Sequence, residues 1–393
     1  MIAFEKAYEI VMGHAVLTAV ETVSLFEGLN RVLAQDVVSD VDMPPFDKSA
    51  RDGYACRRED LSNPMEVIEL ISAGIWPEKK LAPGQCAKIM TGAPLPEGAD
   101  CVIMIEHTKL IDAKTVSFTE EQTDENIFFK GEDIKIGDIV LSKGTRILPA
   151  HAGVMATLGC VKPQVAVRPQ IGVFSTGAEL VEPDTMPGLA QIRDSNSWQL
   201  VSQVRRMGLP VANYGIATDN KDAIDILFKR AVAENDIVII SGGVSVGDFD
   251  LVPDILRDNG INILFDRVAI KPGKPSTFGV GETIRVFGLP GNPVAAFVQF
   301  EILLKPFLLK MMGCEFQPTY VRATLDMPLE RERAPRTSVI PVVFSGHDCV
   351  SPVDYHGSGH IAAMCVTDGF VMFPRGVKLM RRGDIVDVRL LQP

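Results

Sequence analysis

Four consecutive β-branched residues, Ile237 to Ile240, lead directly into a segment rich in glycine, hydroxyl and carboxylate side chains. Such a run predicts a strand that is buried on both faces, as in a parallel sheet. In open α/β sheets, ligands bind beyond the carboxyl ends of the strands, where glycines let backbone amides approach phosphate groups. We therefore expect a polyanion site after this strand, with the candidate residues Gly242, Gly243, Ser245, Asp248 and Asp250.

The two carboxylates of this segment cannot hold an anion directly, so they favour a divalent cation that does. An ordinary glycine-rich turn with solvated acids is the alternative. Two later loops support a site: Lys271 and Lys274 flank a Pro-Gly turn that suits an anion, and Asn292 is the expected N-cap of a helix that begins at Pro293. The N–H groups at that helix end are expected to face the same ligand.

Composition limits the classes of protein. The chain has 393 residues, which suggests two to four domains. A net charge of −11 without a Lys/Arg-rich stretch argues against a general nucleic-acid binder. Seven scattered cysteines, never spaced as Cys-x-x-Cys, indicate reduced thiols in a cytosol. The N-terminus is not that of a signal peptide, and no membrane span is expected, because the most apolar helix is interrupted by Glu301, Lys305 and Pro306.

The predicted elements change in kind along the chain. Residues 4–33 predict two short helices, and short β runs from Val37 to about Asp138 predict a compact insertion. Strands and helices alternate over residues 170–312, which predicts a doubly wound parallel sheet, and β patterns return beyond Pro318. We thus expect an α/β multidomain protein with a helical and linker domain (1–45 and 138–166), a β-rich insertion (46–137), an α/β domain (167–315) and a C-terminal β-barrel (316–393).

Five segments, in order, resemble the MoeA family, the molybdopterin molybdenumtransferases. They begin at Pro45, Ile89, Asp236, Ile270 and Val286, and the resemblance runs from about residue 5 to the C-terminus. It implies a four-part layout whose central sheet domain is of the molybdopterin-binding type, and a homodimer with an active site shared between subunits. It also implies a molybdopterin adenylyltransferase upstream, and molybdoenzymes or cofactor-handling proteins downstream.

The resemblance implies the last metal step of molybdenum cofactor synthesis. Adenylylated molybdopterin binds, molybdate enters the dithiolene, and the pyrophosphate bond is cleaved to release AMP, with Mg²⁺ as cofactor. The implied catalytic residues are Asp52, Asp133, Glu179, Asp250 and Lys271, and the implied metal ligands are Asp219 and Asp250. The residues implied to bind the substrates are Thr91, Gly92, Ser175, Thr176, Gly177, Asp194, Asn196, Asp219, Gly242, Gly243, Ser245, Arg267, Lys274, Pro290, Gly291, Asn292, Arg322 and Ser358.

Each acid also has a purely structural interpretation. Asp52 lies in an Arg-Asp-Gly turn, where acids are usually solvated, and Asp133 could simply start a strand. Glu179 could be an ordinary helix-start acid, and Asp219 fits an N-cap for the helix from Asp222.

Two histidines and two basic residues leave further questions open. His356 and His360 are four residues apart, but the glycines between them favour a loop without zinc. Lys48 and Arg51 stand where many family members have Asn and Met, and Arg267 aligns with a family lysine. These differences leave open whether the oxyanion is molybdate or tungstate.

Two other functions stay possible on the sequence. One is a molybdopterin adenylyltransferase, against which the four-part length and the β insertion argue, because the stand-alone enzymes lack both. The other is a non-catalytic carrier or scaffold, which the loss of the acidic site residues would signal; here those acids are present.

Overall fold

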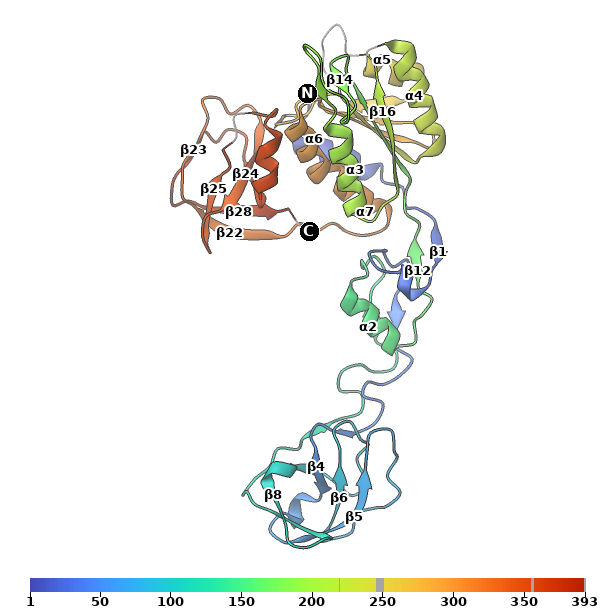
Figure 1. Cartoon of the computed structure of the whole chain (residues 1–393), viewed down its shortest axis with the longest axis vertical. Coiled ribbons are helices and arrows are strands. Elements are labelled where there is room, and N and C mark those ends of the chain that lie inside the picture. Colours follow the sequence, from blue (N-terminus) through green and yellow to red (C-terminus); the bar gives the residue numbers. More distant parts are fainter. Residues whose placement is uncertain (219, 245–250, 355–356, 392–393) are drawn as a thin grey trace. The chain divides into compact units, whose positions relative to one another are not determined.

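The computed structural model describes residues 1–218, 220–244, 251–354 and 357–391. The chain forms two compact units, which we describe separately (Figure 1). Unit 1 comprises Met1–Gln35, Lys143–Pro149 and Lys162–Pro393, and unit 2 comprises Asp36–Ser142 and Ala150–Val161. No helix of the described residues is long and apolar enough to cross a membrane.

A six-stranded sheet with the order β16-β13-β17-β21-β20-β18 forms the centre of unit 1. The first four strands are mutually parallel, and β20 and β18 add an antiparallel edge. The predicted doubly wound parallel sheet is therefore confirmed, with an antiparallel extension that the sequence pattern did not predict. The strands are β13 (Ile171–Thr176), β16 (Val211–Ala217), β17 (Ile237–Ser241), β18 (Asn262–Phe265), β20 (Thr277–Val280) and β21 (Arg285–Leu289).

Helices cover both faces of this sheet, as the β-branched run requires. Ile237 and Ile239 belong to a core shared with α3, α6 and α7, whereas Val238 and Ile240 belong to a second core shared with α4 and α5. Figure 1 shows α4 and α5 apart from α3 and α6. The helices are α3 (Asn196–Arg206), α4 (Lys221–Glu234), α5 (Val252–Asp258), α6 (Pro293–Gln299) and α7 (Lys305–Met311).

The apolar helix predicted from Pro293 to Met312 is not a continuous α-helix. A π-helical turn over Phe300–Leu304 separates α6 from α7. Pro306 follows this turn and has no N–H to donate to the carbonyl one turn earlier, so the regular ladder is interrupted there. The helix N-cap position is Asn292, as predicted, but its side chain makes no capping hydrogen bond.

The C-terminal part of unit 1 is the predicted β-barrel. In the spatial order β24-β25-β22-β28-β26 each strand pairs with the next, and β24 also pairs with β26, which closes the ring. Val342, Val350, Phe373 and Val388 are buried in its core. The elements are β19 (Ile270–Lys271), β22 (Tyr320–Leu325), β23 (Leu329–Glu330), β24 (Thr337–Phe344), β25 (Cys349–Pro352), β26 (Gly369–Phe373), β27 (Leu379–Met380) and β28 (Ile385–Leu390).

The N-terminal segment contains one of its two predicted helices. Helix α1 (Phe4–Gly13) is present, but the second helix is only a 3-10 turn over Leu25–Glu27. Asn30 has φ +64, which ends any helix. Val32 and Leu33 then form isolated β-bridges with Arg146 and Val165, respectively. The apolar spacing therefore marks neither a helix nor a common buried face, because Val32 is buried but Leu29 is exposed. Two strands complete this region, β1 (Val20–Thr22) and β12 (Gln164–Ala166).

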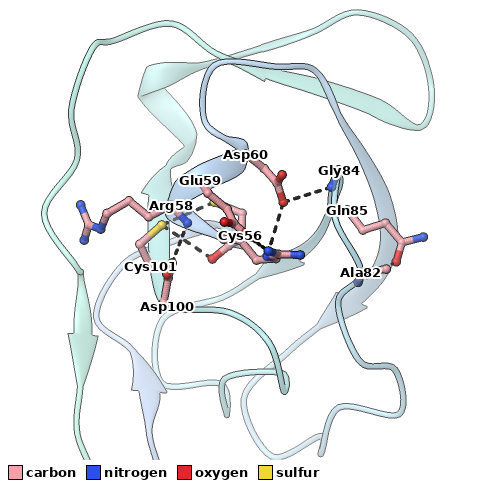
Figure 2. Close-up of polar contacts among 10 residues, drawn as sticks. Cys56, Arg58, Glu59, Asp60, Ala82, Gly84, Gln85, Asp100 and Cys101 are labelled. Atoms are coloured by element: carbon pink, nitrogen blue, oxygen red, sulfur yellow. Dashed lines mark hydrogen bonds and ion pairs between the residues drawn. The ribbon is translucent and has the colours of Figure 1, made fainter.

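Unit 2 contains the predicted β-rich insertion, a six-stranded sheet with the order β7-β4-β6-β5-β9-β8. Figure 2 shows one end of it, where Cys56 and Cys101 face each other with sulfur atoms 3.7 Å apart and the Arg58 amide donates to Asp100. Its strands are β4 (Gly53–Cys56), β5 (Met65–Ile71), β6 (Gln85–Ile89), β7 (Cys101–Met104), β8 (Thr108–Leu110) and β9 (Thr115–Phe118). Outside this sheet lie β2 (Val37–Val38), β3 (Lys48–Ser49), β10 (Ile127–Phe128), β11 (Ile139–Leu141) and α2 (Pro149–Thr157).

Candidate functional site

The three predicted loops of the α/β domain meet at one edge of the sheet. Strands β13, β17 and β21 are neighbours and parallel, with Ser175 opposite Ser241 and Ser241 opposite Leu289. The chain leaves β13 toward β16 on one side and returns to β17 on the other. This reversal of strand order creates the crevice in which doubly wound sheets bind ligands.

A cavity of about 260 Å³ lies at this edge, and we call it the strand-edge cavity. Among the predicted site residues, Glu179, Asn196 and Pro290 contribute to its wall, together with glycines from three loops. The residues that line it are Thr176, Gly177, Glu179, Leu180, Ile192, Asn196, Ser241, Gly242, Gly243, Val244, Pro275, Pro290 and Gly291. The structure thus brings together residues more than one hundred positions apart in the sequence, from 176 to 291.

A buried polar network fixes the floor of this cavity. Asp194 accepts hydrogen bonds from the Ser175 hydroxyl (3.0 Å) and from the backbone and hydroxyl of Ser197 (3.1 and 2.5 Å). Asn196 donates from Nδ2 to Ser241 Oγ and to the carbonyl of Gly291, both at 2.7 Å. Its Oδ1 is buried and has no partner among the described residues. Since an unsatisfied buried acceptor is costly, this oxygen indicates a donor on a bound ligand.

Two glycines of this site, Gly177 after β13 and Gly242 after β17, allow close packing between neighbouring strands. Gly242 has φ +92, and a Cβ there would lie 2.3 Å from the carbonyl oxygen of Thr176. Its N–H donates to Leu289 O at 3.0 Å, and that of Gly177 donates to Ala217 O at 3.4 Å. These two amides therefore join neighbouring strands and do not bind phosphate as expected.

A second cavity of about 270 Å³ lies beside Lys271, and we call it the lysine cavity. Besides Lys271, its wall includes Arg331, Ser338 and Gly357 from the C-terminal domain. Lys271 lies in β19, which pairs with β24 and so joins the Lys-Pro-Gly-Lys turn to the barrel. Pro275, at the other end of the turn, lines the strand-edge cavity.

Arg331 is a residue that sequence reasoning missed. Its guanidinium donates to Ser338 Oγ at 2.7 Å and to the carbonyls of Arg336 (2.8 Å), Val377 (2.8 Å) and Pro374, and it lies 4.3 Å from the centre of the Phe373 ring. Burial lowers the pKa of this group below its ordinary value. Four of its five N–H groups are thus engaged within the protein, and it contributes positive charge to the wall.

Several predicted residues lie outside both cavities. Arg267, Lys274, Asn292 and Arg322 line neither of them, and Arg322 is exposed on β22 opposite Asp387. The backbone carbonyl of Ser358 accepts a hydrogen bond from Val294 N–H (3.1 Å) in the first turn of α6. That amide is therefore occupied by the protein, which corrects the expectation that it faces the ligand.

Unit 2 carries the remaining predicted residues. The exposed Asp52 carboxylate accepts hydrogen bonds from the backbone and hydroxyl of Thr91, at 2.6 and 2.9 Å, and these bonds lower its pKa. Gly92 follows Thr91 and donates its N–H to Ser49 O at 2.8 Å. Asp133 is exposed, and its backbone N–H donates to Met43 O. The structure therefore brings the two predicted motifs of this unit together at Asp52 and Thr91.

Three predicted residues, Ser245, Asp219 and Asp250, and also Asp248 and His356, lie outside the described residues. In helix α4 the N-cap is Asn220, whose Oδ1 accepts hydrogen bonds from Asp222 and Ala223 amides. The proposed capping role of Asp219 is therefore wrong. Within the described ranges, no group of three or more His, Cys, Asp or Glu residues is placed to hold a metal ion.

Comparison with known proteins agrees with the fold. The chain matches the MoeA N-terminal region (domain I and II) over residues 2–159, a probable molybdopterin binding domain over 172–310 and the MoeA C-terminal region (domain IV) over 318–391. It is 36% identical to a molybdopterin molybdenumtransferase of Staphylococcus epidermidis, over 100% of this chain and 96% of that one. A Staphylococcus aureus protein of the same name is 36% identical over 94% and 91% of the two chains.

A solved structure shows the same architecture. The molybdopterin biosynthesis MoeA protein of Pyrococcus horikoshii OT3 superposes with a TM-score of 0.86 and 32% identity, covering 99% of this chain and 100% of that one. Sequence and structure therefore agree over the whole length of the chain. The chain belongs to the MoeA family of molybdopterin molybdenumtransferases, enzymes of molybdenum cofactor biosynthesis.

Proposed function

We propose that this chain transfers molybdenum from molybdate to adenylylated molybdopterin and releases AMP. The observation that supports this most is the strand-edge cavity, which places the Thr176 and Ser241 hydroxyls and the unpartnered Asn196 Oδ1 around one space at the switch point of the sheet. The Ser241 hydroxyl already donates to Pro290 O at 3.5 Å, so we assign recognition of the substrate to Asn196 Oδ1, which can accept from a hydroxyl or amino group. Asp194 holds Ser175 and Ser197 in place beneath them.

We propose Mg²⁺ as the cofactor, held by Glu179 together with Asp219 and Asp250. Mg²⁺ prefers oxygen ligands such as carboxylates, so Glu179 in the cavity wall fits this cation. When bound, Mg²⁺ would neutralise part of the charge of the pyrophosphate. The chain's own residues orient that pyrophosphate, and the hydrogen bonds of the Gly177 and Gly242 amides hold the ends of neighbouring strands together.

We propose that molybdate binds near Lys271. A small oxyanion needs fixed positive charge, and Lys271 shares the lysine cavity with the Arg331 guanidinium. Because four of the five N–H groups of Arg331 are engaged, Lys271 is the donor that we expect to contact the oxyanion. The Pro-Gly turn connects this cavity to the strand-edge cavity through Pro275.

We propose that Asp52 acts as a fixed charge or a cation ligand, with Asp133 in the same acidic set. Hydrogen bonds from Thr91 lower the pKa of Asp52, which makes its carboxylate a weaker base. The extra lysine of its motif, Lys48, lies over the Phe128 ring with Nζ 5.6 Å from the ring centre. Part of the added charge of this motif is therefore placed on an aromatic face.

We also propose a homodimer with an active site shared between subunits and the four-part domain division given above. We place the enzyme in the cytoplasm, because all seven cysteines are free thiols in the structure. Its proposed partners are a molybdopterin adenylyltransferase that supplies substrate and proteins that take up the finished cofactor.

The experiment is AMP release by the purified protein with adenylylated molybdopterin and Mg²⁺, with and without molybdate. We expect release that depends on molybdate, is lost in Asp52→Ala, and needs more molybdate in Lys271→Ala than in the control Lys274→Ala. Consumption of ATP would indicate an adenylyltransferase instead. Tight substrate binding without any AMP release would indicate a carrier.

A further inference from the structure

A third cavity of about 250 Å³ lies away from the two sites described above, and we call it the α3 cavity. It is lined by helix α3, the π-helical turn, α7, the segment that enters the barrel, and Arg146. None of its lining residues lines the strand-edge cavity or the lysine cavity. Its polar wall residues include Arg146, Gln203, Arg206, Glu301 and Lys305.

A buried ion pair forms part of this wall. Lys305 Nζ lies 3.2 Å from Glu301 Oε2, and the two side chains are only 14% and 8% exposed. The backbone carbonyl of Glu301 also accepts a hydrogen bond from Arg389 at 2.6 Å. Because removing charges from water is unfavourable, a buried ion pair adds little net stability by itself. Its presence in a cavity wall favours a binding role.

The side chain of Gln203 leaves one buried acceptor unsatisfied. It is 7% exposed, and its Nε2 donates to Glu301 Oε1 at 3.1 Å and to Phe297 O at 3.4 Å. The opposite orientation would bring its oxygen against two other oxygens, so the observed orientation of the amide is fixed by its partners. Oε1 has no hydrogen-bond partner among the described residues. A ligand donor would satisfy it.

The backbone at this cavity is irregular. Phe300 and Glu301 lie in the π-helical turn, and both line the cavity. Single π-turns inside helices occur frequently at functional sites. Pro306 accounts for the interrupted ladder, but it does not account for the ion pair or the unsatisfied amide.

The charge and shape of the wall indicate the class of ligand. Three cations, Arg146, Arg206 and Lys305, stand against two carboxylates, Glu301 and Glu315. Lys305 and Arg389 also lie over the Phe316 ring, 5.7 and 5.3 Å from its centre. Met207, Leu309 and the half-buried Phe316 supply apolar surface. The wall thus combines positive charge, one free acceptor and flat apolar contacts, in a chain whose net charge is −11.

We propose that the α3 cavity is a binding site for a small organic anion, in which a carboxylate or phosphate is attached to a flat apolar body that also carries a hydroxyl or amino donor. The anion faces the arginines, the donor satisfies Gln203 Oε1, and the apolar body packs on Met207 and Phe316. This site is independent of the transfer reaction.

The test is calorimetric titration of the full-length protein with 4-hydroxybenzoate, compared with benzoate and phenol. We expect 4-hydroxybenzoate to bind more tightly than either simpler probe, and Arg206→Glu to weaken it by about tenfold or more. Arg205→Glu is the matched control, because this neighbouring exposed arginine does not line the cavity. Gln203→Leu should remove the advantage of the hydroxyl and leave benzoate binding nearly unchanged.

A strand-edge variant separates this site from the catalytic one. Gly242→Ala should keep 4-hydroxybenzoate binding even where it abolishes AMP release. The proposal is overturned if none of the probes binds, if Arg205→Glu weakens binding as much as Arg206→Glu, or if Gly242→Ala removes binding while thermal unfolding shows a folded protein.

Discussion

Individual residues at the strand edge have roles that their residue type alone does not reveal. Gly242 matters because there is no room for a Cβ beside the Thr176 carbonyl. Asn196 matters because its Nδ2 is engaged while its Oδ1 has no partner in the part of the chain that the structure describes. Asp194 is buried and holds two serines, one from β13 and one from α3. The sequence predicted all three as site residues, but the contacts that each one makes follow only from the structure.

Gly242→Ala should abolish AMP release and destabilise the fold. The new Cβ would lie 2.3 Å from Thr176 O, and the residue would keep φ +92. Gly260→Ala is a matched control, because Gly260 has φ +75 but nothing within 4 Å of the added Cβ. We expect the control to lower the free energy of unfolding by about 1–2 kcal/mol and to retain activity. Equal effects of both substitutions on activity and unfolding would contradict the packing role of Gly242.

Buried thiols should make stability fall at high pH. Burial raises the pKa of the Cys86 thiol from 9.0 to about 12, so the unfolded chain loses this proton at lower pH than the folded chain. The free energy of unfolding should therefore decrease between about pH 8.5 and about pH 11. Urea titrations over this range should show a smaller decrease for Cys86→Ala than for the unchanged protein. Parallel pH profiles for the two proteins would refute this assignment.

At the scale of elements, the sequence correctly predicted those strands and helices that are determined by the residue types of neighbouring positions in the chain. The run ending at Ile240 was correctly predicted as a strand buried on both faces, since β-branched residues without alternation suit only that position. The predicted second helix near Leu29 was wrong, because tertiary bridging to Arg146 and Val165 prevails over the apolar spacing. The predicted long helix is divided by a π-turn that directly precedes the turn containing Pro306, the one local signal of an interruption.

Part of the site could not be predicted, because it depends on contacts between residues that are far apart in the sequence. Arg331 is sixty residues from Lys271 in the sequence and has no motif of its own, and only the pairing of β19 with β24 brings the two to one cavity. By contrast, Thr176 ends β13, and Gly242 and Gly291 follow the ends of β17 and β21 in the same parallel sheet, so the general rule for such sheets placed them together.

The Lys-Pro-Gly-Lys turn should depend on Gln299 of α6. This fully buried side chain donates to Pro272 O at 3.3 Å, and a Cβ on Gly273 would lie 2.2 Å from its Nε2. Gly273→Ala should therefore destabilise the protein, and it should do so less in a Gln299→Ala background, where space has been made. Urea unfolding of the two single variants and the double variant measures this coupling. Strictly additive free energies would show that the two residues do not interact.

At the scale of the whole molecule, the proposed site residues are divided between the two units. Asp52 and Thr91 belong to unit 2, whereas the strand-edge and lysine cavities belong to unit 1. A homodimer with a shared active site would bring the unit 1 residues of one subunit and the unit 2 residues of the other to the same substrate.

Mixed dimers should test this arrangement. Asp52→Ala and Lys271→Ala proteins, each inactive or weakly active, should regain AMP release after they are unfolded together and refolded, because some mixed dimers then contain one intact site. Each variant refolded alone is the control, and sedimentation establishes the oligomeric state. Absence of recovery in a proven mixed dimer would place both residues of a site in one chain.

The most direct test of the central claim is the ratio of molybdenum transferred to AMP released in a single turnover. Enzyme and adenylylated molybdopterin are mixed with molybdate and Mg²⁺, and the quenched product is analysed for molybdenum and for AMP. We predict equal amounts of both, and neither product in the absence of molybdate. AMP release that proceeds at the same rate without molybdate, or molybdenum bound to substrate that keeps its AMP, would contradict the proposed reaction.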